Sequence, residues 1–216
     1  MRKLFIQLTF IFLLSQSLVF SDYQAKDYTY LIGNLPGLDD ELLKMHLKLY
    51  QGYVLNSNTL LKKLQALNEN GQNKTPEFAG LKRMLGWEFD GMLLHEYYFD
   101  NLGKTENSKD SPISKKIESD FGSFDNWKKD FAATGAMRGI GWVVAYIDPK
   151  EGRLINQWIN EHDVGHLSGG KPLLVMDVFE HAYITQFGLD RAKYMDVFFN
   201  NINWKKVNER LTNARS

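Results

Sequence analysis

The chain has 216 residues, 44% hydrophobic and 24% charged, a composition typical of a globular protein of one large domain or two small ones. Its 26 basic residues balance its 26 acidic residues, so there is no basic excess for non-specific binding to nucleic acid. The chain has no cysteine, which excludes disulfide frameworks, thiol catalysis and thiolate metal sites. Any metal ion must therefore be held by histidine, carboxylate or water.

The first 21 residues have the pattern of a secretory signal. Arg2 and Lys3 give a positive start, and Leu4–Leu14 is an apolar stretch too short to span a membrane comfortably. Ser21 is a small residue at the expected cleavage position. We therefore expect residues 1–21 to be removed and the mature protein to be secreted or periplasmic, without stable membrane association. An uncleaved membrane anchor is the alternative.

Two long helices are predicted for the N-terminal half. Asp39 suits the N-cap of a helix over 39–69, in which apolar residues recur with a period near 3.6. After a short polar turn, a second helix is expected over 76–102, because Pro76 suits a helix start and Gly103 suits its C-cap. Helices joined by so short a turn should form an antiparallel hairpin.

The second half mixes helical and strand patterns. Strands are predicted at 141–148, 153–160 and 173–176, and helices at 123–137, 181–187 and 192–211. The polar stretch 103–112 separates the halves, which gives a helical-hairpin domain over 22–104 and a C-terminal α/β domain over 111–216. A hairpin of helices followed by a small antiparallel sheet with flanking helices predicts the α+β class.

Four polar residues lie in segments that otherwise look buried: His46, His95, Asp177 and His181. A buried carboxylate is costly unless it is paired or binds a metal, and one carboxylate with several imidazoles suits iron, manganese or zinc. If a helical turn begins at Asp177, His181 faces the same way four residues later. Each residue also has a structural interpretation, because a histidine on an apolar helix face is commonly a core residue and Asp177 could be a helix N-cap.

Five segments stand out as motifs along the chain: Tyr53-Val54, HEYYFDNL at 95–102, GIGW at 139–142, DVFEHAY at 177–183 and RAKYMDVFFNNINW at 191–204. In this order, they resemble the iron/manganese superoxide dismutase family. The strongest match is 177–183, where the family usually has D-V-W-E-H-A-Y. The resemblance spans roughly residues 27–211. It implies a helical hairpin followed by an α/β domain.

The resemblance also implies one iron or manganese ion per subunit, with four protein ligands: His46, His95, Asp177 and His181. In the family, the first-helix ligand lies eight residues before the tyrosine that matches Tyr53. Here His46 lies seven residues before Tyr53, and Met45 occupies the ungapped position. We assign the ligand to His46, since a thioether is a poor ligand for hard metal ions.

The resemblance assigns residues around the ion as well. Tyr53 and His162 would hold the bound solvent, with His162 replacing a glutamine whose alternative family position is Gly91 here. His166 is interpreted as an exposed loop histidine. Arg191 matches a family arginine near the substrate funnel and would attract superoxide, the expected small-molecule substrate. A homodimer is also implied, with Glu180 of one subunit reaching His181 of the other.

The implied activity is conversion of superoxide to oxygen and hydrogen peroxide by redox cycling of the ion. The first helix lacks a second histidine usual in the family, and Leu49 and Tyr50 occupy that region. The alternative is therefore a non-catalytic iron- or manganese-binding relative that has lost its proton gate. A zinc hydrolase using the same ligands would lack an obvious general base.

Overall fold

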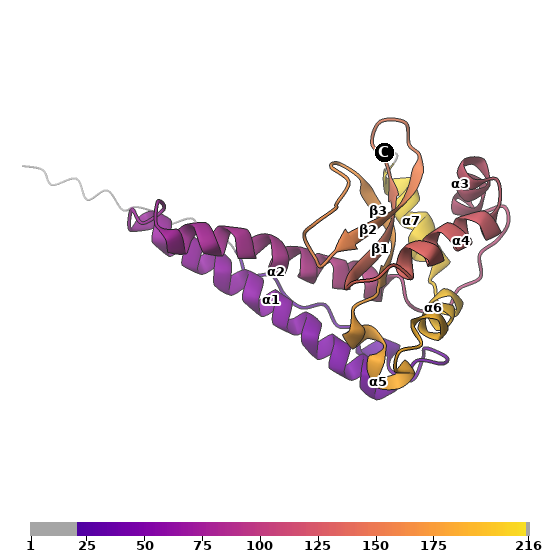
Figure 1. Cartoon of the computed structure of the whole chain (residues 1–216), viewed down its shortest axis with the longest axis horizontal. Coiled ribbons are helices and arrows are strands. Elements are labelled where there is room, and N and C mark those ends of the chain that lie inside the picture. Colours follow the sequence, from indigo (N-terminus) through magenta and orange to yellow (C-terminus); the bar gives the residue numbers. More distant parts are fainter. Residues whose placement is uncertain (1–20, 215–216) are drawn as a thin grey trace, which may run out of the picture.

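The computed structural model describes residues 21–214 and shows a long helical hairpin joined to a layered α/β unit (Figure 1). The predicted secretory signal falls almost wholly on residues 1–20, outside the described part. The hairpin consists of α1 (Asp40–Glu69) and α2 (Pro76–Asp100), as expected from the sequence. Within residues 21–214, no helix combines the length and apolarity needed to cross a membrane. The domain boundary stays a prediction.

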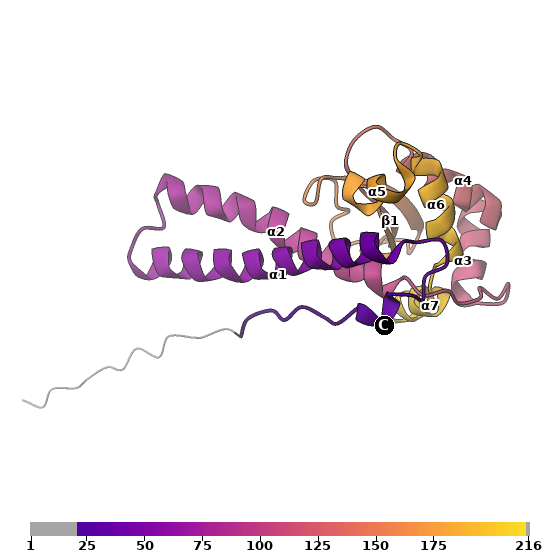
Figure 2. The ribbon, with the colours of Figure 1, turned by 90° about the horizontal axis from the view of Figure 1, so that it is seen from below.

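Local signals set the start of each hairpin helix. The Asp39 carboxylate accepts hydrogen bonds from the first-turn amides of α1, and the Thr75 hydroxyl accepts one from Phe78 N at the start of α2. The segment before α1 contains a short 3₁₀ helix, η1 (Thr29–Leu31). The chain from residue 21 to 28 runs beside the hairpin (Figure 2). Tyr23 is fixed there by two hydrogen bonds between its backbone and the Asn58 amide.

The end of α2 differs from the prediction. The helix ends at Asp100 with Asn101 as its C-cap, two residues before the expected glycine. The buried Asn101 side chain donates to Tyr98 O, at 2.9 Å, and accepts from Val175 N, also at 2.9 Å. Because Val175 belongs to the sheet, the helix ends where its last turn is attached to the C-terminal unit.

The C-terminal unit contains a three-stranded antiparallel sheet in the order β2-β1-β3. Its strands lie within two residues of the predicted ranges: β1 (Gly141–Ile147), β2 (Leu154–Asn160) and β3 (Lys171–Asp177). Two helices precede the sheet, α3 (Pro112–Phe121) and α4 (Phe124–Gly135). α4 lies within the helix predicted over 123–137, whereas α3 was not predicted from the sequence. Its Ser111 N-cap and Pro112 start lie at the end of the polar stretch interpreted as a linker.

The C-terminal helices are shorter than predicted. The expected helix over 181–187 is a 3₁₀ turn, η2 (Glu180–Ala182), followed by the single-turn α5 (Ile184–Phe187). The expected helix over 192–211 is two helices, α6 (Arg191–Asn200) and α7 (Trp204–Ala214). Hydrogen bonds to residues distant in sequence fix the break between α6 and α7. Asn201 donates to Pro36 O, and Asn203 N donates to Asn101 O.

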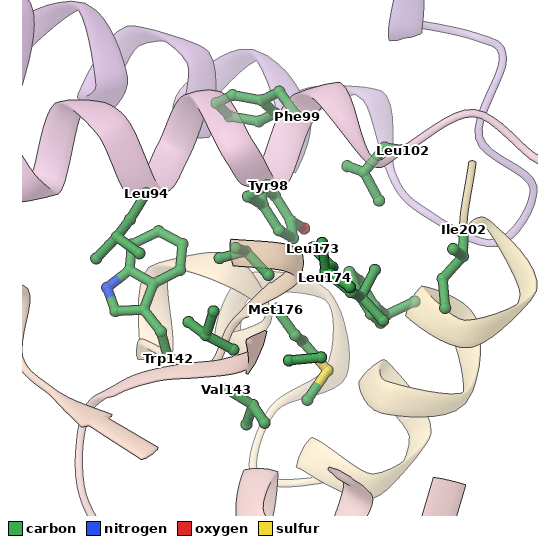
Figure 3. Packing of buried hydrophobic residues seen from close by; sticks show 14 of the residues in the cluster. Leu94, Tyr98, Phe99, Leu102, Trp142, Val143, Leu173, Leu174, Met176 and Ile202 are labelled. Atoms are coloured by element: carbon green, nitrogen blue, oxygen red, sulfur yellow. The ribbon is translucent and has the colours of Figure 1, made fainter. Parts of the chain in front are cut away.

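The core lies on both faces of the sheet, so β1 is buried along its whole length. On one face, Leu94 and Tyr98 of α2 point toward the strands, whereas Phe99 points to the opposite side of α2, toward α1 (Figure 3). On the other face, Val143 lies against Gly135 of α4. This layering brings the C-terminal part of α2 to the end of β3, where the candidate site forms.

Candidate metal centre

The four candidate ligands come together from four different elements. α1 carries His46, α2 carries His95, β3 ends at Asp177, and η2 carries His181. Their ligand atoms all lie within 4.8 Å of one another. Asp177 Oδ2 lies 3.1 Å from His46 Nε2, 3.0 Å from His181 Nε2 and 3.8 Å from His95 Nε2. One oxygen of the carboxylate therefore lies close to one nitrogen of each of the three imidazoles.

The helix geometry of α1 places His46, not Met45, in this cluster. The helix is α-helical throughout, and seven residues make nearly two full turns, so His46 and Tyr53 share the face toward α2. Met45 is 42% exposed, whereas His46 is buried. The seven-residue spacing thus brings the candidate ligand and the tyrosine to one site on a regular helix.

The backbone between Asp177 and His181 differs from the helical turn that was predicted. No helical turn begins at Asp177, which is the last residue of β3. Phe179 N donates to Asp177 Oδ1 at 2.8 Å, and the 3₁₀ turn that follows brings His181 back to the other carboxylate oxygen. Both carboxylate oxygens of Asp177 therefore have partners. Oδ1 fixes the turn, and Oδ2 faces the imidazoles.

The donor set fits a metal ion. His95 Nδ1 donates to Gly91 O at 2.6 Å, so the lone pair of the neutral ring lies on Nε2. Among the described residues this fully buried Nε2 has no hydrogen-bond partner. Leaving a buried acceptor unsatisfied costs roughly 1–3 kcal/mol, and a cation at the cluster would satisfy it. One carboxylate with three imidazoles suits iron, manganese or zinc.

The electrostatics of the cluster favour a cation. Burial lowers the pKa of both His46 and His95, so these rings are neutral at pH 7. A neutral imidazole has one nitrogen without a proton, and His46 can turn Nε2 to a cation by moving to its other tautomer in place of its hydrogen bond to Asp177. Burial alone would raise the pKa of Asp177, but the imidazoles of His181 and His46 outweigh it and hold this pKa below its ordinary value. His46, His95 and Asp177 can therefore bind a cation near neutral pH with little proton release.

A second chain of polar groups adjoins the cluster. Trp142 Nε1–H donates to His162 Nδ1 at 3.1 Å, and the indole can only donate. The proton of the neutral His162 ring is therefore on Nε2, which lies 2.7 Å from Tyr53 Oη and donates to it. Tyr53 thus keeps its own hydroxyl proton for another acceptor. The Tyr53 ring lies 5.0 Å from the His95 ring.

His162 should make the metal-free protein sensitive to acid. Burial lowers its pKa to about 4, from about 6.5 in an unfolded chain. Between these values the unfolded state binds more protons, so stability falls as pH falls. When the pH is lowered from 7 to 5, the free energy of unfolding should fall in both metal-free proteins. We expect the fall to be about 2 kcal/mol larger in the wild type than in His162→Gln. Urea unfolding at both pH values measures this, and equal losses would contradict it.

Two other residues named from the sequence have structural roles in the fold. The Arg191 guanidinium donates to the carbonyls of Gly135, Met137 and Gly139 and so holds the turn after α4. Its attraction of superoxide stays a prediction. Tyr50, considered as a replacement for the missing histidine, donates to Glu96 Oε1 at 3.0 Å rather than to Tyr53 or His162.

The surroundings of His162 were not predicted from the sequence. The centroid of the Trp87 ring lies 4.7 Å from that of His162, with the two rings edge to face. His166 is an exposed loop histidine, as interpreted from the sequence, and it is also hydrogen-bonded to the His162 backbone and to Tyr146. The four-residue spacing of the two histidines was visible in the sequence, but only the fold shows that they share a loop against β1.

Comparison with known proteins agrees with this geometry. Residues 109–210 match the family model for the C-terminal domain of iron/manganese superoxide dismutases. The chain is 37% identical over 185 residues to an iron superoxide dismutase of Cupriavidus metallidurans, covering 83% of this chain and 91% of the relative. It is also 37% identical over 189 residues to an iron superoxide dismutase of Aquifex pyrophilus, covering 84% and 87% of the two chains.

A manganese relative matches as well. The chain is 30% identical over 181 residues to superoxide dismutase [Mn] 1 of Halobacterium salinarum, covering 83% of this chain and 89% of that one. Both metals thus occur among the similar proteins. Identity at this level over most of both chains, together with the C-terminal model match, shows that the protein belongs to the iron/manganese superoxide dismutase family of oxidoreductases.

Proposed function

We propose that the protein converts two superoxide ions and two protons to oxygen and hydrogen peroxide, using one iron or manganese ion per subunit. The residues proposed to hold the ion are His46, His95, Asp177 and His181. The observation that carries the proposal is the buried Nε2 of His95, which has no hydrogen-bond partner among residues 21–214 and faces two further imidazoles and one carboxylate. The chemistry that such an ion supplies when bound is one-electron exchange with superoxide in alternate directions.

The protein's own part is to set the charge around the ion and to handle protons. Asp177 is the one carboxylate in the proposed ligand set, so it is the only ligand that brings a full negative charge. Forming peroxide consumes two protons. Tyr53 is suited to pass a proton inward, because His162 Nε2 donates to its oxygen and leaves the tyrosine proton free. Burial raises the pKa of Tyr53, so the hydroxyl stays protonated at neutral pH.

Three further assignments belong to the proposal. Arg191 would attract the superoxide anion. Glu180 is exposed beside His181, whose side chain is 22% accessible, which suits the expected homodimer contact through these two residues. Residues 1–21 would direct the chain to a secreted or periplasmic location before cleavage.

Metal-replacement kinetics test the proposed activity. The purified protein is stripped of metal and reloaded separately with iron, manganese and zinc, and superoxide decay is followed by pulse radiolysis. We expect catalytic decay with iron or manganese and none with zinc, because zinc cannot exchange electrons. One bound iron or manganese ion per chain without catalysis would instead indicate a non-catalytic metal-binding relative.

The same samples test the remaining assignments. If Arg191 attracts superoxide, kcat/KM falls with ionic strength less steeply in Arg191→Gln than in the wild type. Sedimentation of the loaded wild type and Glu180→Gln gives the oligomeric state and its dependence on the proposed contact. N-terminal sequencing of the exported protein locates the cleavage site, and a start at Met1 would contradict signal removal.

A further inference from the structure

A short loop after β2 carries His162, and its shape is held by a histidine outside the metal cluster. His166 Nε2 lies 2.8 Å from the backbone oxygen of His162, and Tyr146 Oη lies 2.9 Å from His166 Nδ1. We infer that His166 is a positioning residue that holds His162 against Trp142 and Tyr53. The inference rests on the proposed function only in taking His162 to matter for activity.

The His166 ring is hydrogen-bonded at both nitrogens. A carbonyl oxygen only accepts, so His166 Nε2 carries a proton and donates to His162 O. The other nitrogen, Nδ1, is hydrogen-bonded to the Tyr146 hydroxyl. Tyr146 lies on β1 and is buried, so the chain of bonds starts from a fixed strand. Asp90 of α2, with Oδ2 3.6 Å from His166 Nε2, flanks the ring.

The loop needs such a constraint because its backbone is strained. Glu161 has φ 54°, the left-handed region that a residue with a side chain seldom adopts. Gly165 has φ 105°, which glycine adopts without strain, and a Cβ there would lie 2.9 Å from Trp158 O, so the strain of the loop lies at Glu161. Left-handed residues persist where the surrounding structure fixes them. His162 directly follows the strained Glu161. The hydrogen bond from His166 to His162 O therefore holds the backbone at the position where it could otherwise change its conformation.

The ring of His162 has little freedom if it is to keep both partners. It must remain 3.1 Å from Trp142 Nε1 and 2.7 Å from Tyr53 Oη at the same time. Hydrogen bonds weaken steeply when their geometry is lost, so a small rotation of the loop breaks one of the two. Releasing the His162 carbonyl should therefore disturb the tyrosine without touching any proposed metal ligand.

Three variants test this role. His166→Ala removes the donor, and His166→Gln keeps an amide that can donate to the same carbonyl. Val164→Ala is the matched control, because it shortens a 57% exposed side chain in the same loop. With iron or manganese bound, we expect His166→Ala to lower kcat/KM roughly tenfold at unchanged metal content. His166→Gln should recover most of this loss, and the control should match the wild type.

A second readout needs neither metal nor turnover. In the metal-free protein, the indole N–H resonance of Trp142 in a ¹H–¹⁵N spectrum, assigned with Trp142→Phe, reports its bond to His162. We expect His166→Ala to shift this resonance toward its position in His162→Ala. An unshifted resonance overturns the inference. A shifted resonance with unchanged kcat/KM supports positioning and contradicts the role proposed for His162.

A double-mutant cycle separates positioning from general stabilisation. If His166 acts through His162, adding His166→Ala to His162→Ala causes no further fall in kcat/KM. A further tenfold fall in the double variant would mean that His166 acts independently and would overturn the inference. Thermal unfolding of all variants accompanies the kinetics, so that each comparison is made on folded protein.

Discussion

Asp177→Asn is expected to abolish metal retention and superoxide dismutation together. The substitution removes the only carboxylate of the proposed ligand set while keeping nearly the same shape. Oδ2 of Asp177 lies within 3.8 Å of all three imidazole Nε2 atoms, so no other group can replace its charge. Loss of groups that merely orient metal ligands already costs roughly 10–100-fold, and we expect more than ~100-fold here.

Elemental analysis and dismutation assays on the same preparation measure both effects. Asp110→Asn is the matched control, because it makes the same charge change on a side chain that is 93% exposed. It should keep full metal content and activity. Full metal content in Asp177→Asn would show that the ion is held elsewhere and would refute the proposed ligand set.

Gly91→Ala should destabilise the protein and impair catalysis, although glycine to alanine inside a helix normally stabilises. A Cβ at this position would lie 2.8 Å from Tyr53 Cδ1 and 2.9 Å from Cε1, closer than real contacts allow. Moving the aromatic ring costs about 1–3 kcal/mol, against a gain of about 1 kcal/mol in helix propensity. The ring must also leave its 2.7 Å hydrogen bond with His162, so we expect kcat/KM to fall roughly tenfold or more.

The same helix provides the control. Gly80 of α2 is exposed, and a Cβ there would meet nothing within 4 Å. Gly80→Ala should therefore raise the free energy of unfolding by about 1 kcal/mol without changing activity. Urea unfolding of both metal-free variants gives the comparison. If Gly91→Ala gained as much stability as Gly80→Ala, Tyr53 would not be held where the structure places it.

The sequence predicted the elements whose boundaries depend on neighbouring residues. The N-cap at Asp39, the proline start of α2 and the three strands are set by local chemistry, and the structure has them within two residues of the predicted ranges. The break between α6 and α7 could not be predicted in this way. It depends on Asn201 and Asn203 bonding to residues 36 and 101, which only the folded chain brings near.

The candidate site likewise has features that local chemistry predicts and features that depend on packing between distant parts of the chain. Chemistry alone favoured His46 over Met45, and the structure places His46 in the cluster because α1 is a regular helix. The position of His162 between Trp142 and Tyr53 follows from packing of the loop after β2 against β1 and α1, which no local pattern encodes. The interpretation of His166 as an exposed loop histidine is confirmed, but its hydrogen bonds to His162 O and Tyr146 depend on the same packing and were not predicted.

The wide sequence separation of the candidate ligands has a thermodynamic consequence. His46 and Asp177 are 131 residues apart, and only Asp177 and His181 are near neighbours along the chain. An unfolded chain therefore cannot present the complete set of donors, and an ion that binds them all binds only the folded state. At a free ion concentration 1,000 times its Kd, such binding adds about 4 kcal/mol to the free energy of unfolding. The ion would then act as a reversible crosslink between the hairpin and the sheet.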